Sequence, residues 1–104
     1  MTNEYGTPLD RNGYAPTIMQ KAERCYMCCR SDSLKRHEIY GSSNREKSKA
    51  FGLWVWICPD CHYDLHFAHA ERKMWLREQG QIRAQSHYGW TENEFRGKFG
   101  RSYK

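Results

Sequence analysis

The sequence predicts a small α+β domain in which two strands and a helix are fastened by a four-cysteine zinc site, with further helices toward the C-terminus. Four of the five cysteines form two Cys-x-x-Cys pairs, Cys25 with Cys28 and Cys58 with Cys61. Two runs of strand character lie between the pairs, and the second pair leads into a helix-forming segment. Only 38% of the 104 residues are hydrophobic, so the core is thin and a bound metal would supply stability that packing does not.

Residues 1–20 are expected to form an irregular N-terminal arm, and residues 21–104 the zinc-bound domain with its C-terminal helical extension. Glycine and proline recur through the arm, and its apolar residues follow neither a helix nor a strand period. Tyr5 and Tyr14 are its candidate anchors to the domain. We therefore predict no regular element in the arm.

The two strands are predicted at 34–40 and 53–57. Side chains alternate along the first strand, which places His37 on the side opposite Arg36 and Glu38. The second strand is an apolar run of aromatic and β-branched residues. We expect the two strands to pair antiparallel, as a hairpin with a long connection.

A short helix is predicted inside that connection. Ser43 and Glu46 have the spacing of a capping box, in which each side chain bonds to the other residue's backbone. The helix is therefore expected over 44–51, and Gly52 follows as the residue that ends it.

The C-terminal half is predicted to be helical. One helix is expected to begin near residue 60, and strong helix formers continue over 68–85, with Gly80 as a candidate interruption. Thr91 and Glu94 form a second capping box, which opens a last short helix.

The four paired cysteines are predicted to hold a structural Zn²⁺. Two disulfides are the alternative, but five cysteines is an odd number and we expect no secretory signal before them. Free metal-binding thiols indicate a reducing compartment, so the expected location is the cytoplasm. Cys29 is the alternative to Cys28 as a ligand, although Cys25-x-x-Cys28 has the spacing of the second pair.

Three histidines are candidates for a second metal site. His62 and His66 are spaced i, i+4, so on a helix they project from one face. If the first strand packs against that helix, His37 joins them, and three protein ligands leave positions open on a divalent cation. His69 would replace His66 as a ligand if the helix began later.

The charge of the chain favours a polyanionic partner. The net charge is +5 and the sequence pI is about 9.0, as is common among proteins that bind DNA or RNA. Arg45, Lys47 and Lys49 lie in the connection between the strands and are the candidate phosphate contacts. No apolar run approaches the ~18 residues of a membrane span, so we expect no membrane partner.

These motifs together resemble the HNH (ββα-metal, or His-Me finger) endonucleases, most closely the small members found in bacteriophages and prophages. The matching segments are Arg36-His37-Glu38-Ile39, Asn44-Arg45-Glu46-Lys47-Ser48, Phe51-Gly52-Leu53, Ile57-Cys58-Pro59-Asp60-Cys61-His62 and Phe99-Gly100-Arg101-Ser102-Tyr103. The resemblance covers about residues 25–104.

The resemblance implies roles for individual residues. His37, His62 and His66 would hold the catalytic cation, for which Mg²⁺, Mn²⁺, Ni²⁺ and Zn²⁺ are the candidates. Asn44 would stand for the middle asparagine of the family, which orients the loop or the base. The paired cysteines would hold the structural zinc that many members carry.

Glu38 departs from the family pattern, because most members place the general-base histidine at this position. A carboxylate, with an unperturbed pKa of about 4.3, is a weaker base than imidazole. Three interpretations stay open: Glu38 is the base, His37 is the base while the metal is held otherwise, or the protein does not cleave.

The leading hypothesis is a metal-dependent endonuclease that hydrolyses phosphodiester bonds in DNA, in the cytoplasm of the host cell if a phage encodes it. One alternative is a zinc-stapled module that binds nucleic acid without cleaving it. Another is a phage-encoded factor that contacts a host protein, with residues 1–20 as the contact segment. Phage packaging or recombination machinery is a further candidate partner.

Overall fold

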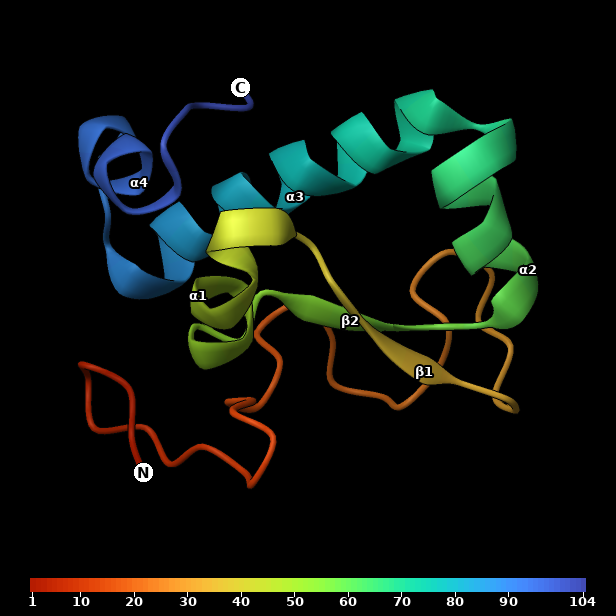
Figure 1. Ribbon diagram of the computed structural model, residues 1–104, viewed down its shortest axis with the longest axis horizontal. Coiled ribbons are helices and arrows are strands. Elements are labelled where there is room, and N and C mark those ends of the chain that lie inside the picture. The colour runs from red at the N-terminus through yellow and green to blue at the C-terminus, as the bar shows by residue number, and fades with distance from the viewer.

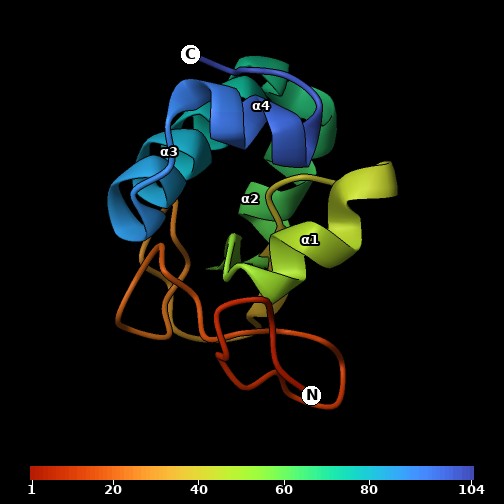
Figure 2. The ribbon, with the colours of Figure 1, turned by 90° about the vertical axis from the view of Figure 1, so that its left-hand side faces the viewer.

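The computed structural model covers residues 1–104 and has an α+β fold, with a two-stranded sheet and four α-helices. The elements in chain order are β1 (Lys35–Glu38), α1 (Arg45–Ala50), β2 (Trp54–Ile57), α2 (Pro59–Tyr63), α3 (Ala70–Tyr88) and α4 (Glu92–Phe99). The hairpin lies in the middle of the molecule, with the N-terminal arm along one side and α3 along the other (Figure 1 and Figure 2).

β1 and β2 form the antiparallel hairpin that the sequence predicts, although both strands are shorter than expected. His37 pairs with Val55, and Glu38 pairs with Trp54. Side chains alternate along each strand, so His37 and Val55 share the face toward the helices, while Glu38 and Trp54 share the face toward the arm. Val55 is fully buried on its face.

The N-terminal arm covers β2 on the side away from β1. The indole N–H of Trp54 donates to the Ala15 carbonyl at 2.7 Å, and the Trp56 N–H donates to the Gln20 side chain at 2.8 Å. The Tyr26 N–H donates to the Trp56 carbonyl at 2.9 Å. The arm contains no helix or strand, yet together with the turn that contains Tyr26 it covers the free edge of the sheet, which would otherwise expose unpaired backbone groups.

The capping box predicted for α1 is wrong. The chain enters α1 through a 3₁₀ turn, Ser42–Asn44, and the residue before the helix makes no side-chain cap. The Arg45 N–H, the first of α1, donates to the Ser42 carbonyl, so the tighter turn satisfies a backbone donor that the start of a helix otherwise leaves without a partner. Gly52 follows the helix at φ +71°, where glycine is favoured.

The expected interruption of the long helix at Gly80 is also wrong, because α3 runs unbroken through it. A side-chain carbon at this position would lie 2.7 Å from the Tyr40 hydroxyl. The glycine therefore allows α3 to pack closely on the end of the hairpin, and the contact offsets the low helix propensity.

The C-terminal helix closes an aromatic core. The predicted capping box of Thr91 and Glu94 is confirmed at the start of α4. Phe95 and Phe99 are buried, and their ring centroids lie 5.6 and 4.8 Å from that of Tyr40. The Tyr40 hydroxyl donates to a carbonyl of α3, so this core joins the hairpin to both C-terminal helices.

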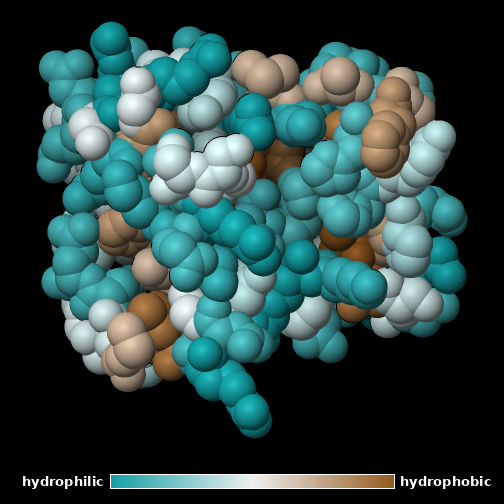
Figure 3. All heavy atoms as spheres, viewed as in Figure 1, coloured by the Kyte–Doolittle hydropathy of each residue, from teal (hydrophilic) through white to brown (hydrophobic).

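The surface is largely hydrophilic, with apolar side chains showing at the end of the molecule where α2 meets α3 (Figure 3). None of the helices combines the length with the apolar character needed to cross a bilayer.

Candidate metal centres

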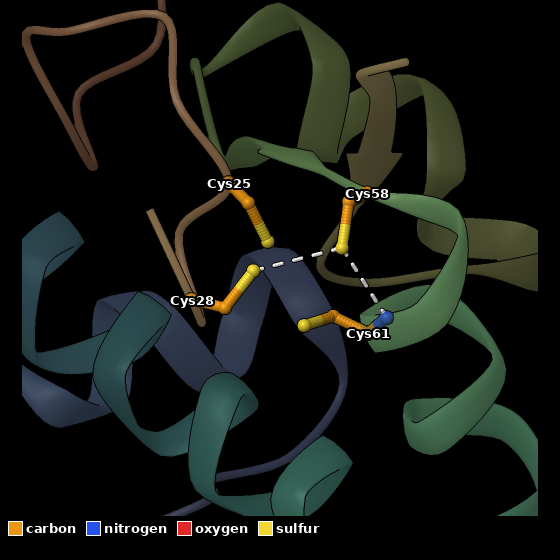
Figure 4. A group of neighbouring side chains, drawn as sticks. All are labelled: Cys25, Cys28, Cys58 and Cys61. Atoms are coloured by element: carbon orange, nitrogen blue, oxygen red, sulfur yellow. Dashed lines mark hydrogen bonds between the residues drawn. The ribbon is translucent and has the colours of Figure 1, made fainter. Parts of the chain in front are cut away.

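The four paired cysteines point toward a common centre (Figure 4). Cys25 and Cys28 lie on the turn before β1, and Cys58 and Cys61 lie where β2 meets α2. Their sulfur atoms are all within 4.8 Å of one another. Cys28 Sγ and Cys58 Sγ are 3.7 Å apart, too far for a disulfide but close to the ~3.8 Å edge expected for thiolates around zinc. The cluster is geometrically suited to binding a metal ion such as zinc.

Backbone hydrogen bonds shape both cysteine turns. The Cys25 N–H donates to the Arg30 carbonyl at 2.8 Å, which closes the first turn. Cys58 caps α2, since its sulfur accepts the Cys61 N–H at 3.5 Å. Pro59 occupies the start of the helix, where no N–H donor is needed. The local sequence thus sets the direction of the sulfur atoms before any metal binds.

The electrostatics of the cysteine cluster also favour a cation. Burial raises the pKa of Cys25, but backbone N–H groups, including that of Cys58, outweigh it and lower the pKa to about 7. Burial and the neighbouring thiols raise the pKa of Cys61 far above its usual range. One thiolate forms readily, and the remaining thiols ionise when a cation supplies the compensating charge.

Cys29 lies outside this cluster. Its φ of +68° turns the chain, and its N–H donates to the Cys25 carbonyl at 2.8 Å. Its side chain is exposed and is absent from the group of converging sulfurs. Cys28, rather than Cys29, is the residue placed to act as a ligand.

The three candidate histidines also come together. One ring nitrogen from each of His37, His62 and His66 lies within 4.8 Å of the others, and the Nε2 atoms of His62 and His66 are 3.0 Å apart. Ligands at zinc–nitrogen distances of ~2.0–2.1 Å would stand about 3.3 Å apart, so the spacing suits a divalent cation. His69 is not part of the group, and its ring lies 3.2 Å from Glu71 instead.

A π-helical turn, Asp64–Ala68, carries His66 and links α2 to α3. The His69 N–H donates to the Asp64 carbonyl at 2.7 Å, and the backbone leaves the helical conformation at His69. Leu65 anchors the turn in the core. This bulge explains why His69 does not follow the face of the other histidines, and such bulges are frequent at functional sites.

The histidine cluster favours neutral imidazoles. Burial, together with repulsion from His62 and His66, lowers the pKa of His37 to about 4. Burial and His62 also lower the pKa of His66. Because the neutral ring is the form that binds metals, His37 and His66 present lone pairs at neutral pH.

Glu38 does not join the histidines, contrary to what a general base at that site requires. Its carboxylate accepts a hydrogen bond from the Tyr14 hydroxyl at 3.0 Å and pairs with the Arg45 guanidinium. The side chain is only 12% exposed, and it lies on the face of β1 toward the arm. The alternation of side chains along the strand is the physical reason.

The other candidate residues of the connection are engaged in structural contacts. The amide of Asn44 and the ammonium of Lys47 donate to backbone carbonyls of α4, at 2.9 and 2.7 Å. Lys49 is 9% exposed and lies 3.2 Å from the Glu46 carboxylate. Arg45 and Lys47 are the exposed members of the predicted phosphate contacts, although Arg45 is paired with a carboxylate.

Two lysines that the motifs did not single out lie beside the histidines. Lys35 lines a groove that His62 and His66 also line. Lys73 is near enough to contribute to the lowered pKa of both His37 and His66. The sequence signal for Lys35 is its place two residues before His37, on the same face of the strand.

Comparisons with protein-family models, with curated proteins and with solved structures find no match to this chain. The two clusters of candidate ligand atoms, and the motifs from which they come, are therefore what indicates a function for this chain.

Proposed function

We propose that this protein is a metal-dependent endonuclease of the HNH (ββα-metal) type, which hydrolyses phosphodiester bonds in DNA. The observation that carries the proposal is the convergence of His37 from β1 with His62 and His66 from the helical segment after β2. A strand pair followed by a helix, with metal-ligand side chains from both, is the arrangement that the sequence motifs lead one to expect.

The histidine cluster suits a catalytic cation better than a structural one. It offers three protein ligands, and His66 is exposed, so room is left for a substrate oxygen. A bound divalent cation would polarise the phosphodiester and stabilise the departing oxygen. The residues contribute by holding neutral imidazoles in place, which the lowered pKa of His37 ensures at neutral pH.

The proposal gives Glu38 a positioning role. Hydrolysis forms a bond from the water oxygen to phosphorus and breaks the bond to the bridging oxygen; solvent water at the exposed side of the cluster would take the proton that the attacking water loses, and solvent would return a proton to the departing oxygen. Glu38 would reach the histidines only after leaving both Tyr14 and Arg45. We therefore assign it to holding Arg45 and the arm, and not to removing that proton.

Positive charge beside the cluster supports a polyanionic substrate. Lys35 and Lys73 lie next to the histidines, and the whole chain carries a net charge of +5. Arg45 adds an exposed guanidinium on the connection between the strands. Lysine and arginine side chains of this kind supply the sequence-independent part of DNA binding.

A zinc-stapled module that binds DNA without cleaving it is the second candidate. The contacts of Glu38 favour it, because they leave no carboxylate near the histidines to act as the base. In that case the protein would bind DNA with a marked dependence on salt, and it would not nick DNA with any divalent cation.

Substitution of His62 tests the proposal directly. Supercoiled plasmid should be nicked by the wild type with Mg²⁺, Mn²⁺, Ni²⁺ or Zn²⁺, and His62→Ala should reduce the rate at least ~100-fold because a ligand is lost. Elemental analysis should find two bound ions per chain in the wild type and one in His62→Ala, with the melting temperature nearly unchanged.

His69→Ala is the matched control, since this partly exposed histidine lies just outside the cluster. It should retain both ions and full activity. Pure wild-type protein that cleaves no DNA with any of the four cations would overturn the nuclease proposal and select the binding module.

A further inference from the structure

A groove of about 300 Å³ opens beside the histidine cluster. Its lining includes His62 and His66, the aromatic pair Tyr63 and Phe67, and Lys35. The groove therefore joins the candidate metal ligands to an aromatic surface and a positive charge. Its volume exceeds the ~150 Å³ of a nucleobase, on the scale of pockets that enclose small ligands.

Tyr63 and Phe67 are among the most exposed large apolar side chains of the molecule, at 60% and 74%. They are spaced i, i+4 with ring centroids 5.0 Å apart, and the Phe67 ring lies 6.2 Å from the His66 ring. Leu65, between them in sequence, is 1% exposed and packs into the core. Because Leu65 fixes which side of this helical segment packs on the core, Tyr63 and Phe67 are held on the side that faces solvent. Their exposure therefore follows from the packing of the segment.

The charge around the groove identifies the kind of occupant. No carboxylate lines the groove, and the Lys35 ammonium supplies a positive charge in its lining. The nearby Asp64 carboxylate lies 3.4 Å from Arg72, so its charge is offset. An occupant with a flat apolar face and an adjacent negative charge fits these surroundings, and a nucleobase with its phosphate has both properties.

We propose that Tyr63 and Phe67 form a stacking platform for an unpaired nucleobase, so that the substrate presents a single-stranded or extruded nucleotide next to the histidine cluster. The inference rests on the proposed function and names the substrate class for that site. A base within a duplex has both faces covered by its neighbours, so only an unstacked base is able to lie on these rings.

The test is the binding of fluorescent oligonucleotides to the 104-residue protein purified with zinc. Binding is measured by fluorescence anisotropy, and no further divalent cation is added. Three probes are compared: a single strand, an abasic strand with the same phosphates, and the corresponding duplex. The single strand should bind on the order of tenfold more tightly than the abasic strand, because stacking adds to the phosphate contacts.

The double variant Tyr63→Ala, Phe67→Ala should bind the single strand and the abasic strand equally. Its salt dependence should match that of the wild type, since the lysines are untouched. Tyr63→Phe should keep the preference, because the ring is retained. Ile82→Ala is the matched control: it removes another exposed apolar side chain, on α3 and outside the groove, and should change nothing.

Equal wild-type affinity for the single and abasic strands would overturn the inference, as would a double variant that binds like the wild type. A double variant that binds like the wild type would indicate that the exposed rings contact a protein partner and not a nucleobase. The nuclease proposal is judged separately by plasmid nicking. If the double variant still nicks DNA and the wild type shows no preference for unpaired bases, the nuclease proposal stands and the stacking platform is rejected. If binding depends on unpaired bases but no DNA is nicked, the platform stands and the nuclease proposal is rejected.

Discussion

The cysteine cluster and the histidine cluster lie next to each other along α2, yet they differ in how closed they are. Cys25 and Cys58 are each 1% exposed, Cys61 is partly buried and Cys28 is exposed, and their four sulfur atoms converge on one centre. The histidine cluster has three members, and His66 is exposed beside a groove. A closed set of four ligands is typical of a structural metal, and an open set of three is typical of a reactive one.

The position of the histidine cluster depends on the cysteine cluster, whereas the cysteine cluster does not depend on the histidines. Cys58 is the N-cap of α2, and the same helix carries His62. The sulfur cluster therefore determines where His62 stands relative to His37 on β1. Loss of the cysteine cluster should disturb the histidines, whereas loss of a histidine should leave the sulfurs in place. Substitutions in the two clusters should therefore have unequal effects.

The largest effect is expected from Cys58→Ser. Removal of a buried thiolate should abolish tight zinc binding and destabilise the fold by more than ~5 kcal/mol, because the free energy of metal binding is part of the free energy of folding. Circular dichroism and zinc content of the purified variant measure both effects. Retention of zinc and of the wild-type melting temperature would show that the sulfur cluster does not hold the fold together.

Cys29→Ser is the matched control for that experiment. Cys29 is exposed, and its sulfur lies outside the cluster. A substitution of this kind at the surface should change the free energy of unfolding by no more than about 0.5 kcal/mol. Loss of zinc from this variant would mean that Cys29 replaces Cys28 as a ligand.

A smaller effect, and one confined to the histidine cluster, is expected on acidification. The pKa of His37 is lowered from 6.5 to about 4, chiefly by burial, so between these values the unfolded chain binds more protons than the folded one. The stability associated with neutral His37 should be complete above pH 6.5 and should be lost as the pH falls toward 4. The loss should be on the order of 3 kcal/mol.

Urea unfolding at a series of pH values measures this effect. His37→Gln removes the titrating ring, so the variant should show a shallower loss of stability over the same range. With no divalent cation at the histidines, any acid-induced release of zinc from the cysteines affects both proteins alike, and the difference between their curves isolates the histidine. Parallel curves would mean that His37 titrates normally and that burial does not keep it neutral.

The convergence of the cysteines and of the histidines was predictable because each cluster depends on local spacing. The Cys-x-x-Cys pairs and the i, i+4 histidines fix which atoms face the same way within one turn, and the hairpin supplies the remaining contact. The strand alternation also predicts that His37 and Glu38 diverge. The second capping box, at the start of α4, was predictable for the same local reason.

The features that sequence reasoning missed depend on contacts between distant segments. Gly80 breaks no helix because the Tyr40 hydroxyl, far away in the chain, takes the space of its missing side chain. Lys49 has the sequence setting of a solvent-exposed lysine, but it is covered where the arm crosses α1. The π-turn that removes His69 from the histidine face has no signal in the residue pattern. Each outcome was decided by packing that local propensity does not specify.

The smallest effect is expected from Glu38→Gln, which tests whether the far face of β1 takes part in the chemistry of the histidines. The change removes the charge that pairs with Arg45 and weakens the contact with Tyr14, so the free energy of unfolding should fall by about 1 kcal/mol. Plasmid nicking should stay within about threefold of the wild type, because a positioning residue leaves the metal ligands in place. Tyr14→Phe is the matched variant, since it removes the same hydrogen bond from the other side and should have a similar effect.

Loss of a general base typically costs 10²–10⁴-fold in rate. A hundredfold loss in Glu38→Gln, without the same loss in Tyr14→Phe, would therefore show that the carboxylate leaves the arm and acts at the histidine cluster during catalysis.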